Sequence, residues 1–300
     1  MTNTALPVLI NREGGGAASA GAGLSQSVTT AFSRTGVQAD IQMLAASEMN
    51  QAIERAAASH ARIVVAGGDG TIASAAQLLT ETDVELAVLP LGTLNHFARD
   101  LQIPSSLDSA AELAANGTAS PVDVGEVNDR RFINNASVGL YPSMVKDRDR
   151  IRHEHHVPKW LASLPASWAA LSRLPRHRMR IDIGGGGAPI VTPLLFVGNN
   201  RYSLERGSVG ARETLNAGLL SIYAVSRTTR LALLWFGVRA ALGRASRAQD
   251  FEVVGDCEEM IVRLSRPKIE IALDGEVHRL SLPLKFRVRA GALKVVRPSI

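Results

Sequence analysis

The sequence predicts an α/β domain followed by a mainly antiparallel β domain, and three observations lead to that fold class. Residues 1–125 alternate short β-branched runs with alanine-rich stretches, the rhythm of βαβ units around a parallel sheet. After Pro121 this rhythm fades and strand-like runs dominate. The charge changes as well, because residues 1–125 hold 5 arginines and 12 acidic residues (net −7), whereas residues 126–300 have a net charge of +12.

The first half contains two kinds of segment in alternation. Strands are expected at 7–10, 37–44, 62–66 and 86–90, and helices at 18–33, 50–59, 71–79 and 94–101. Glycine-rich or polar turns separate the strands from the helices that follow them. A chain of 300 residues with 46% hydrophobic content is long enough to bury a sizeable core.

The second half contains mostly strand-like runs. They lie at 194–198, 219–225, 260–264, 269–273, 285–289 and 293–296. A run of four glycines at 184–187 predicts a hairpin loop. One helical insertion is expected at about 146–180, where 9 basic residues surround an amphipathic helix that carries Trp160 and Trp168.

Several classes of protein are excluded or disfavoured by simple features. One cysteine, Cys257, excludes an internal disulfide and favours a reducing compartment. The first residues lack the basic and apolar regions of a secretory signal. The strongest apolar run, 231–238, is far shorter than the roughly 20 residues that span a bilayer. We therefore expect a cytoplasmic protein whose membrane contact is peripheral.

Gly67, Gly68, Asp69, Gly70 and Thr71 form a glycine-rich turn between a predicted strand and a predicted helix. Glycines let the backbone approach a ligand closely, and the N–H groups at a helix N-terminus attract anions. The carboxylate of Asp69 repels phosphate unless a metal lies between them. A tight turn in which the aspartate only caps the helix is the alternative.

A second loop, at 90–100, repeats the arrangement of strand, glycine, threonine and helix, and it contains Gly92, Thr93, Asn95 and His96. A third glycine-rich loop begins at Asn11. Neighbouring parallel strands place such loops at one edge of the sheet, where ligands bind in doubly wound folds. Neither a Walker A lysine nor the dinucleotide fingerprint is present. The three loops together predict a nucleotide or phosphate site.

Two carboxylates, Asp274 and Glu276, flank Gly275 at the end of a predicted strand. An Asp-Gly pair is a strong signal for a hairpin turn, and without other information that interpretation is favoured. As chemistry, the acidic pair could hold Mg²⁺ and accept a proton from an attacking hydroxyl group.

The motifs GGDGT at 67–71, PLGTLNHFARDL at 90–101 and LDGE at 273–276 resemble the diacylglycerol kinase/sphingosine kinase catalytic family, in particular its bacterial soluble lipid kinases. The resemblance covers nearly the whole chain. It implies a Rossmann-like α/β nucleotide-binding domain at 1–125, to which residues of about 287–300 return, and a lipid-binding β-sandwich domain at 126–286. NAD kinases look like a distant branch with the same two-domain fold.

The same resemblance implies an ATP- and Mg²⁺-dependent kinase that phosphorylates a hydroxyl of diacylglycerol or a related lipid. Asp274 would be the general base, Asp69 would act through Mg²⁺ or the reacting oxygens, and Glu276 would help to hold Mg²⁺ or the nucleotide. The implied nucleotide-binding residues are Asn11, Gly67, Gly68, Gly70, Thr71, Gly92, Thr93, Asn95 and His96. Whether Asp69 or Asp274 is the base stays open.

The chain departs from the family pattern at three places, one of which is Arg12, which follows Asn11 where a proline is common. His96 stands where many relatives have aspartate, and residues 214–221 contain no carboxylate where bacterial relatives often bind a structural Mg²⁺. Two alternatives therefore stay beside the lipid kinase. One is a soluble-metabolite kinase of the NAD kinase type, and the other is a catalytically weak protein that binds lipid or nucleotide.

The basic insertion predicts peripheral contact with an anionic membrane, with a solvated helical face as the alternative. Nucleic acid is not an expected partner, because aromatic residues are not interleaved with the basic ones. The histidines at 153–156 favour a solvated charged turn over a zinc site. The sequence leaves the lipid, the regulator and the oligomeric state open, a homodimer included.

Overall fold

A computed structural model describes residues 5–15, 23–139, 177–202, 212, 214–225 and 251–298, and it confirms the predicted fold class. The chain forms two compact units. The first contains Met1–Val124, Leu215–Gly218 and Arg289–Ile300, and the second contains Gly125–Thr214 and Leu219–Val288. The return of the last residues to the first unit was expected from the family resemblance, whereas the short return at 215–218 was not.

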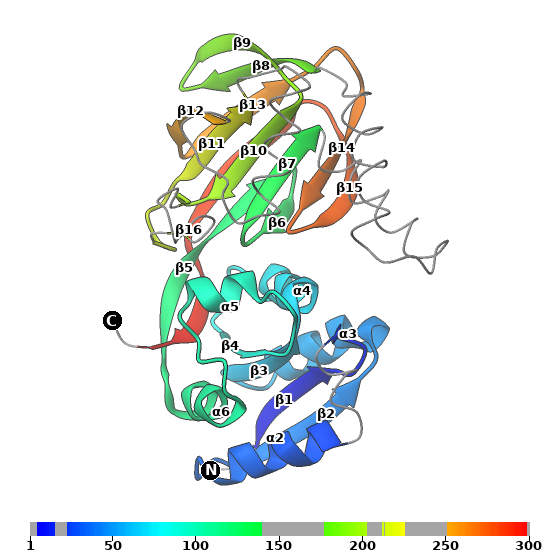
Figure 1. Cartoon of the computed structure of the whole chain (residues 1–300), viewed down its shortest axis with the longest axis vertical. Helices are drawn as coiled ribbons and strands as arrows, with labels where there is room; N and C mark the ends of the chain where they lie inside the picture. The colour runs from blue at the N-terminus through cyan, green and yellow to red at the C-terminus, as the bar shows by residue number, and fades with distance from the viewer. Residues whose placement is uncertain are drawn as a thin grey trace, which may run out of the picture. The chain divides into compact units, whose positions relative to one another are not determined.

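The first unit is built on a parallel sheet (Figure 1). Its strands, in spatial order, are β2 (Ala39–Leu44), β1 (Leu6–Asn11), β3 (Arg62–Gly67), β4 (Glu85–Pro90) and the second part of β16 (Leu284–Arg297). The register pairs Val8 with Val64 and Ile63 with Leu86. Because neighbouring strands are parallel, the loops that follow β1, β3 and β4 leave the same edge.

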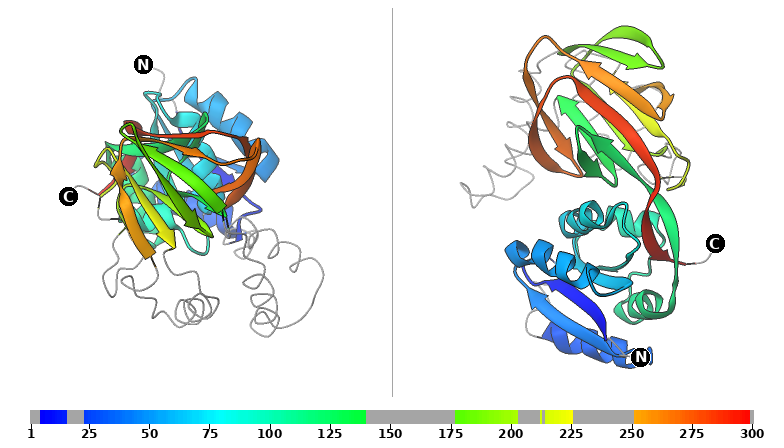
Figure 2. Two further views of the ribbon diagram at one scale, coloured as in Figure 1. Left: turned by 90° about the horizontal axis from the view of Figure 1, so that it is seen from above. Right: turned by 180° about the vertical axis from the view of Figure 1, so that it is seen from behind.

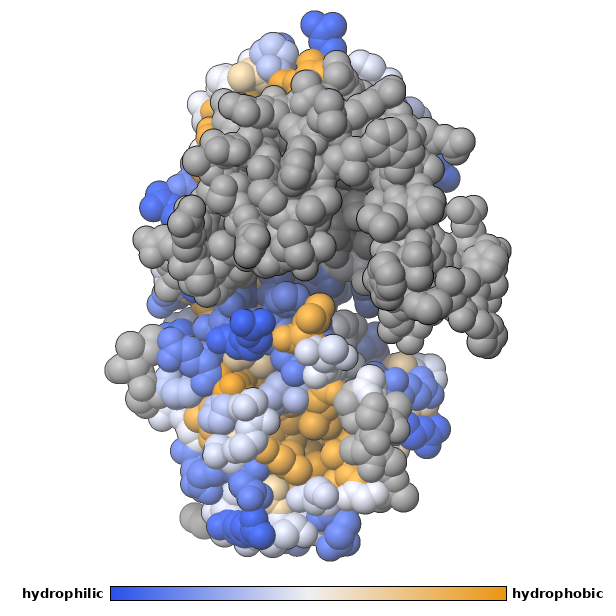
Figure 3. Space-filling view, in the orientation of Figure 1, coloured by the Kyte–Doolittle hydropathy of each residue, from blue (hydrophilic) through white to orange (hydrophobic). Residues whose placement is uncertain are grey.

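Helices cover both faces of this sheet (Figure 1). They are α2 (Gly23–Ser33), α3 (Ala46–Ala57), α4 (Asp69–Leu79), α5 (His96–Asp100) and α6 (Leu107–Asn116). The helix α2 packs on α6, and α3 packs on α4. A sheet covered on both faces needs strands that are apolar throughout, which explains the buried run Ile63 to Ala66. On the face that Figure 3 shows, hydrophobic residues of this unit gather in the middle and hydrophilic ones surround them.

The second unit is a sandwich of two mainly antiparallel sheets. One sheet contains β5 (Thr118–Val127), β6 (Arg130–Phe132), the first part of β16, β13 (Glu259–Arg263), β8 (His177–Ile183) and β9 (Gly186–Thr192). The other contains β12 (Phe251–Cys257), β11 (Leu220–Val225), β10 (Leu194–Asn199), β7 (Asn135–Gly139), β14 (Lys268–Leu273) and β15 (Glu276–Ser281).

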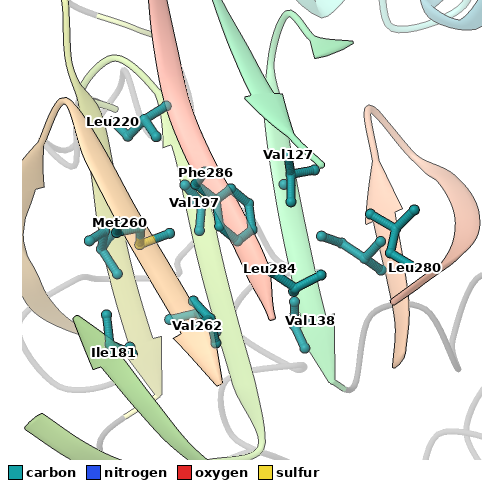
Figure 4. Close-up of a cluster of buried hydrophobic side chains, with 14 of the residues drawn as sticks. Val127, Val138, Ile181, Val197, Leu220, Met260, Val262, Leu280, Leu284 and Phe286 are labelled. Atoms are coloured by element: carbon teal, nitrogen blue, oxygen red, sulfur yellow. The ribbon is translucent and has the colours of Figure 1, made fainter. Parts of the chain in front are cut away.

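Side chains from both sheets meet in one hydrophobic core (Figure 4). Phe286 and Val262 come from the first sheet, and Val138 and Val197 come from the second. All four are at most 2% exposed. Burying a side chain of this kind contributes about 1.5–3 kcal/mol, so this core supplies much of the stability of the second unit.

Several predicted elements differ from the observed ones. The predicted insertion at 146–180 lies mostly outside the described residues, and its last four residues are strand, since β8 begins at His177. The strands predicted at 285–289 and 293–296 are one strand, β16, which continues through Gly291 at a positive φ of 60° (red in Figure 2). The helix α6 was not predicted, although Ser106 caps it by accepting a hydrogen bond from Ser109 N.

The helix α3 begins at Ala46, four residues before the predicted start. Its N-cap residue is Ala45, which has no capping side chain, and the side chain of Glu48 accepts the hydrogen bond of the Ala45 N–H instead. Such a start lacks the usual Ser, Thr, Asp or Asn signal. Both predicted turns of the second unit are confirmed, at Gly184–Gly185 and at Asp274–Gly275, all with positive φ.

Candidate nucleotide and acidic sites

The loops after β1, β3 and β4 lie together in the first unit, as the sequence predicted. Asn11 is 9% exposed and connects two of them. Its Nδ2 donates to Thr71 Oγ1 at 2.9 Å, and its Oδ1 accepts a hydrogen bond from Glu13 N at 3.0 Å. Both ends of the amide are therefore occupied, and the first contribution of Asn11 is to hold the β1 loop against the start of α4.

The loops after β3 and β4 touch through their glycines. A Cβ atom added to Gly92 would lie 2.5 Å from Gly68 Cα, and one added to Gly67 would lie 2.7 Å from Thr71 Cβ. Both distances are too short for real side chains, so no residue other than glycine fits either position without a shift. Leu91 N also donates to Gly67 O at 3.0 Å, which fixes the second loop on the first.

Asn95 shapes the loop after β4 from within. It lies in the left-handed region, with φ 49° and ψ 48°. Its side chain accepts a hydrogen bond from Gly92 N at 2.8 Å and donates to Gly92 O at 2.9 Å, so the amide pairs with both backbone groups of one residue. Asparagine suits this position because it tolerates the left-handed conformation and hydrogen-bonds its own loop.

Asp69 and His96 join these two loops a second time. The backbone N–H of His96, the first residue of α5, donates to Asp69 Oδ1 at 2.7 Å. Asp69 therefore stabilises the start of α5 with one carboxylate oxygen. Thr93 and the side chain of His96 are exposed, in contrast to the inward-facing Asn11.

The helix α4 begins at Asp69 without a side-chain cap. Its N-cap residue is Gly68, and Thr71 lies in the first turn and accepts a hydrogen bond from Asn11. The first N–H groups of a helix have no partner within the helix. A glycine loop in front of such a helix start is suited to bind phosphate groups through backbone N–H donors.

The acidic turn of the second unit is tightly held on one side. Asp274 and Gly275 connect β14 and β15 at φ 47° and 91°. Asp274 Oδ2 accepts a hydrogen bond from Ile133 N at 2.8 Å, and Oδ1 accepts from Asn134 N at 2.7 Å and from Asn135 N at 3.1 Å. Both oxygens of the predicted general base are thus engaged with backbone donors.

Burial raises the pKa of Asp274 from its ordinary value to about 6. The three backbone N–H groups and the charge of Arg212 act in the opposite direction and offset part of that increase. Glu276, two residues later, is exposed. The turn therefore combines one half-buried, hydrogen-bonded carboxyl group, that of Asp274, with one that is exposed to solvent, that of Glu276.

The residues predicted to hold Mg²⁺, Asp69 and Glu276, belong to the first and second units respectively. Within the described ranges, no three acidic, histidine or cysteine side chains gather as metal ligands. Mg²⁺ is commonly bound through one or two carboxylates together with substrate phosphates and water. Asp69 fits that role by its donor chemistry, because its carboxylate lies at a helix start suited to phosphate.

The stretch in which the family resemblance suggested an accessory metal contacts a buried carboxylate directly. Asp123 on β5 is 2% exposed. It accepts hydrogen bonds from Gly218 N at 2.7 Å and from Gly291 N at 2.9 Å, and its own N–H donates to Leu215 O. The oxygens that a cation would use are engaged with backbone donors, so the described contacts do not fit a metal at this position.

Three buried residues near the acidic turn escaped the sequence analysis. They are Asn134, Asn199 and Arg212, which are 6%, 1% and 7% exposed. Only the pair Asn134-Asn135, polar residues between two apolar runs, carried a local signal. The predicted membrane-facing tryptophans and the histidines at 153–156 lie outside the described residues. Of the basic residues assigned to that insertion, Arg178 and Arg180 lie exposed on β8.

Comparison with known proteins places these motifs in a family context. The family profile of the diacylglycerol kinase catalytic domain matches residues 5–127. A probable YegS-like lipid kinase of Pseudomonas putida is 43% identical, over 82% of this chain and 80% of its own. A diacylglycerol kinase of Mycobacterium tuberculosis is 27% identical, over 79% of this chain and 76% of its own.

The fold has a solved counterpart. A crystal structure of a diacylglycerol kinase from Bacillus anthracis superposes with a TM-score of 0.67 at 20% identity. The match covers 98% of this chain and 97% of the other. At this identity the likeness concerns the fold, and it agrees with the arrangement of an α/β unit followed by a β unit.

Proposed function

Because this chain belongs to the family of diacylglycerol kinases and YegS-like lipid kinases, we propose that it transfers the γ-phosphate of ATP, with Mg²⁺, to a hydroxyl of diacylglycerol or a related lipid. The family supports a lipid kinase. The acceptor and the requirement for Mg²⁺ are the parts that we add.

The observation that carries the proposal is the set of three interlocked loops at the uncapped start of α4. The side chains of Asn11, Asn95 and Asp69 form hydrogen bonds that hold the loops together. None of them caps the start of α4, so the backbone N–H groups there can bind an anion. Phosphoryl transfer depends mainly on positioning and on neutralising charge. Rigid glycine loops serve the first requirement.

The acceptor hydroxyl must lose its proton as its oxygen forms a bond to the γ-phosphorus and the bond to the leaving oxygen of ADP breaks. The candidates for the proton acceptor are Asp274, Asp69 and Glu276. Asp274 as general base stays a prediction, and its half-buried carboxylate would have to exchange one backbone hydrogen bond to reach a substrate. Glu276 is exposed and needs no such exchange.

Mg²⁺, when bound with ATP, would neutralise the negative charge of the phosphates. The first unit needs such a contribution, because residues 1–125 carry 5 arginines and no lysine against 12 acidic side chains. Asp69 would hold the ion with the carboxylate oxygen that does not accept the His96 N–H. Glu276 is the second predicted ligand.

The function is tested by incubating the protein with radiolabelled ATP and a panel of lipids in mixed micelles, with Mg²⁺ or with EDTA. We expect label in diacylglycerol or a related lipid only when Mg²⁺ is present. Label in a soluble metabolite without micelles would identify a kinase of the NAD kinase type. ATP binding without transfer to any lipid would identify a weak binding protein, and either result would overturn the proposal.

Peripheral contact with a membrane is part of the same proposal. No helix among the described residues has the length and apolar character to cross a bilayer. The positive charge of residues 126–300 supports attraction to anionic lipid. Sedimentation with vesicles checks this: we expect binding to vesicles that contain the anionic lipid phosphatidylglycerol and none to pure phosphatidylcholine. Equal binding to both would contradict it.

A further inference from the structure

The turn between β6 and β7, residues 133–135, directs its peptide groups to two different sets of partners. All three of its N–H groups donate to the carboxylate of Asp274, at 2.7 to 3.1 Å. In return, Asp274 N donates to Asn135 O at 2.9 Å. The acidic turn at 274–276 is therefore fastened to a segment 139 to 141 positions earlier in the chain.

The opposite side of the same turn is held by Arg212. One guanidinium nitrogen of Arg212, Nη1, donates to Ile133 O, and the other, Nη2, donates to Asn134 Oδ1 at 3.0 Å. Asn199 donates to the backbone carbonyl groups of both residues. Its Nδ2 donates to Ile133 O at 3.0 Å, and its N–H donates to Asn134 O at 2.9 Å.

Tyr202 adds a contact from a third side. Its hydroxyl donates to Asn134 O at 3.0 Å, and its ring centre lies 6.0 Å from the guanidinium carbon of Arg212. Every peptide group of the 133–135 turn named above has a partner of the matching kind. The N–H groups face the negative charge of Asp274, and the carbonyls of Ile133 and Asn134 face the positive charge of Arg212 or neutral donors.

Holding a buried arginine and a half-buried carboxylate in this way is costly, and it is not the arrangement that stability alone requires. Replacing a buried ion pair with apolar residues is often neutral or stabilising, whereas removing one partner is strongly destabilising. The charges of Asp274 and Arg212 do not form an ion pair with each other. They act on each other through the polarised backbone groups of the 133–135 turn. What the arrangement fixes is the place of a turn with two positive φ angles that carries an exposed carboxylate, Glu276.

We propose that Arg212 is a positioning residue of the acidic turn, and that it acts through the 133–135 backbone and Asp274 to hold Glu276 in place for the reaction. This inference rests on the proposed lipid kinase function. A carboxylate displaced by about 1 Å can lower a rate about 100-fold. Arginine is required, because lysine cannot reach Ile133 O and Asn134 Oδ1 with one planar fork.

The test compares Arg212→Met, which removes the charge, and Arg212→Lys, which removes the fork, with Arg263→Met as the matched control. Arg263 belongs to the same unit and pairs with Asp182 on the outer face of β13. For each variant, kcat and the KM for ATP are measured with the lipid substrate. Amide hydrogen exchange of the peptides that contain 133–135 and 274–277 is measured on the same samples.

We expect Arg212→Met to lower kcat at least about tenfold while the KM for ATP changes less than about twofold, because the ATP loops lie in the other unit. Exchange at 133–135 and 274–277 should accelerate at least about tenfold, with Arg212→Lys intermediate and Arg263→Met unchanged. If kcat is unchanged while the wild type is active, the positioning role is overturned, even if exchange accelerates.

The exchange measurement needs no kinase activity, so the two hypotheses fail separately. If the wild type phosphorylates no lipid, the proposed function fails. Unchanged amide exchange at 133–135 in Arg212→Met would then also overturn the role of Arg212 in holding the acidic turn. If Arg212→Met does not fold, Arg212→Lys decides, because it keeps the buried positive charge. Full kcat and wild-type exchange in the lysine variant would show that the fork is not needed.

Discussion

The two candidate sites of this protein are held in opposite ways. The glycine loops of the first unit use neutral amide side chains and backbone contacts, as in the pairs Asn11–Thr71 and Asn95–Gly92. The acidic turn of the second unit uses two charges, the half-buried Asp274 and the buried Arg212, on either side of one backbone turn. Close contacts between glycines therefore determine the shape of the first site, whereas electrostatic interactions hold the second.

This difference has a physical reason. A site for phosphate groups must present N–H donors at close range, and side chains would block that approach, so the loops are shaped by tight glycine contacts. A site that handles a proton needs carboxylates in fixed positions, and a buried carboxylate needs several donors to remain there. The comparison predicts that small steric changes damage the first site, whereas changes of charge damage the second.

The largest combined effect on activity and stability is expected for Gly92→Ala. The new Cβ would lie 2.5 Å from Gly68 Cα, and because that atom is backbone and cannot rotate away, the two loops must separate. We expect kcat/KM for ATP to fall about 100-fold and the free energy of unfolding to fall by about 1–3 kcal/mol. Lipid phosphorylation and chemical denaturation measure the two quantities.

Gly15→Ala is the matched control for that variant. Gly15 lies in the loop after β1, and a Cβ atom there would lie 3.5 Å from Thr93 Oγ1, an ordinary contact. We expect its ATP affinity to stay within about threefold of the wild type. Equal losses in both variants would mean that the loops are sensitive to any substitution, and the argument from space would be wrong.

The second effect separates the two carboxylates of the acidic turn. Asp274→Asn turns one acceptor oxygen into a donor toward a backbone N–H, so one hydrogen bond is lost, and we expect a loss of about 1–3 kcal/mol in unfolding free energy. Glu276→Gln is exposed and should change stability by less than about 0.5 kcal/mol.

Turnover completes that comparison. Both variants should lose lipid phosphorylation, but only Glu276→Gln should lose it without loss of stability, as judged by thermal unfolding of the same samples. If Asp274→Asn is as stable as the wild type, the carboxylate does not anchor the turn. If Glu276→Gln keeps full kcat, Asp274 or Asp69 is the base that the reaction uses.

The sequence predicted the first site better than the second because the two sites depend on different distances along the chain. Glycine loops after apolar strands are local signals, and parallel pairing brings them to one edge. The anchor of Asp274 depends on backbone groups about 140 positions away, and backbone donors carry no residue-type signal. Arg212 likewise looked like one arginine among 28 basic residues of the second half.

A third effect concerns the first unit. Its glycine loops are held by neutral amide side chains and backbone contacts, but the unit also contains a buried charge, Asp123. Asp123→Asn loses one of the two backbone hydrogen bonds, to Gly218 or to Gly291, and we expect a loss of about 1–3 kcal/mol in unfolding free energy. Asp108→Asn, on the exposed face of α6, is the control and should have almost no effect.

Chelation sharpens the same point. Since backbone N–H groups already occupy the Asp123 carboxylate, EDTA should leave the melting temperature of the nucleotide-free protein unchanged. A lower melting temperature in EDTA, restored by Mg²⁺, would show that a structural ion holds this region, contrary to the contacts described.

The smallest effect is a dependence of stability on pH, which should originate in the second unit. His177 at the start of β8 is 7% exposed, and its Nδ1 contacts the guanidinium of Arg266. Burial, and next the charge of Arg266, lower the pKa of His177 below its ordinary value of 6.5. The folded protein therefore binds less proton at this ring than the unfolded chain does, and stability falls as the pH decreases from about 6.5 through the folded-state pKa.

Asp274 contributes with the opposite sign, because its raised pKa of about 6 makes the folded state gain stability as the pH falls through the same range. The wild-type profile alone therefore cannot separate the two groups, whereas the difference between wild type and His177→Gln can. Glutamine keeps an acceptor for Arg266 but does not titrate. We expect urea unfolding at pH 7.5 and 5.5 to show that the wild type loses more stability than the variant on acidification, because only the wild type has a ring that binds less proton in the folded state. Parallel profiles would mean that His177 titrates alike in the folded and unfolded states, and that the contact with Arg266 does not exclude a proton from Nδ1.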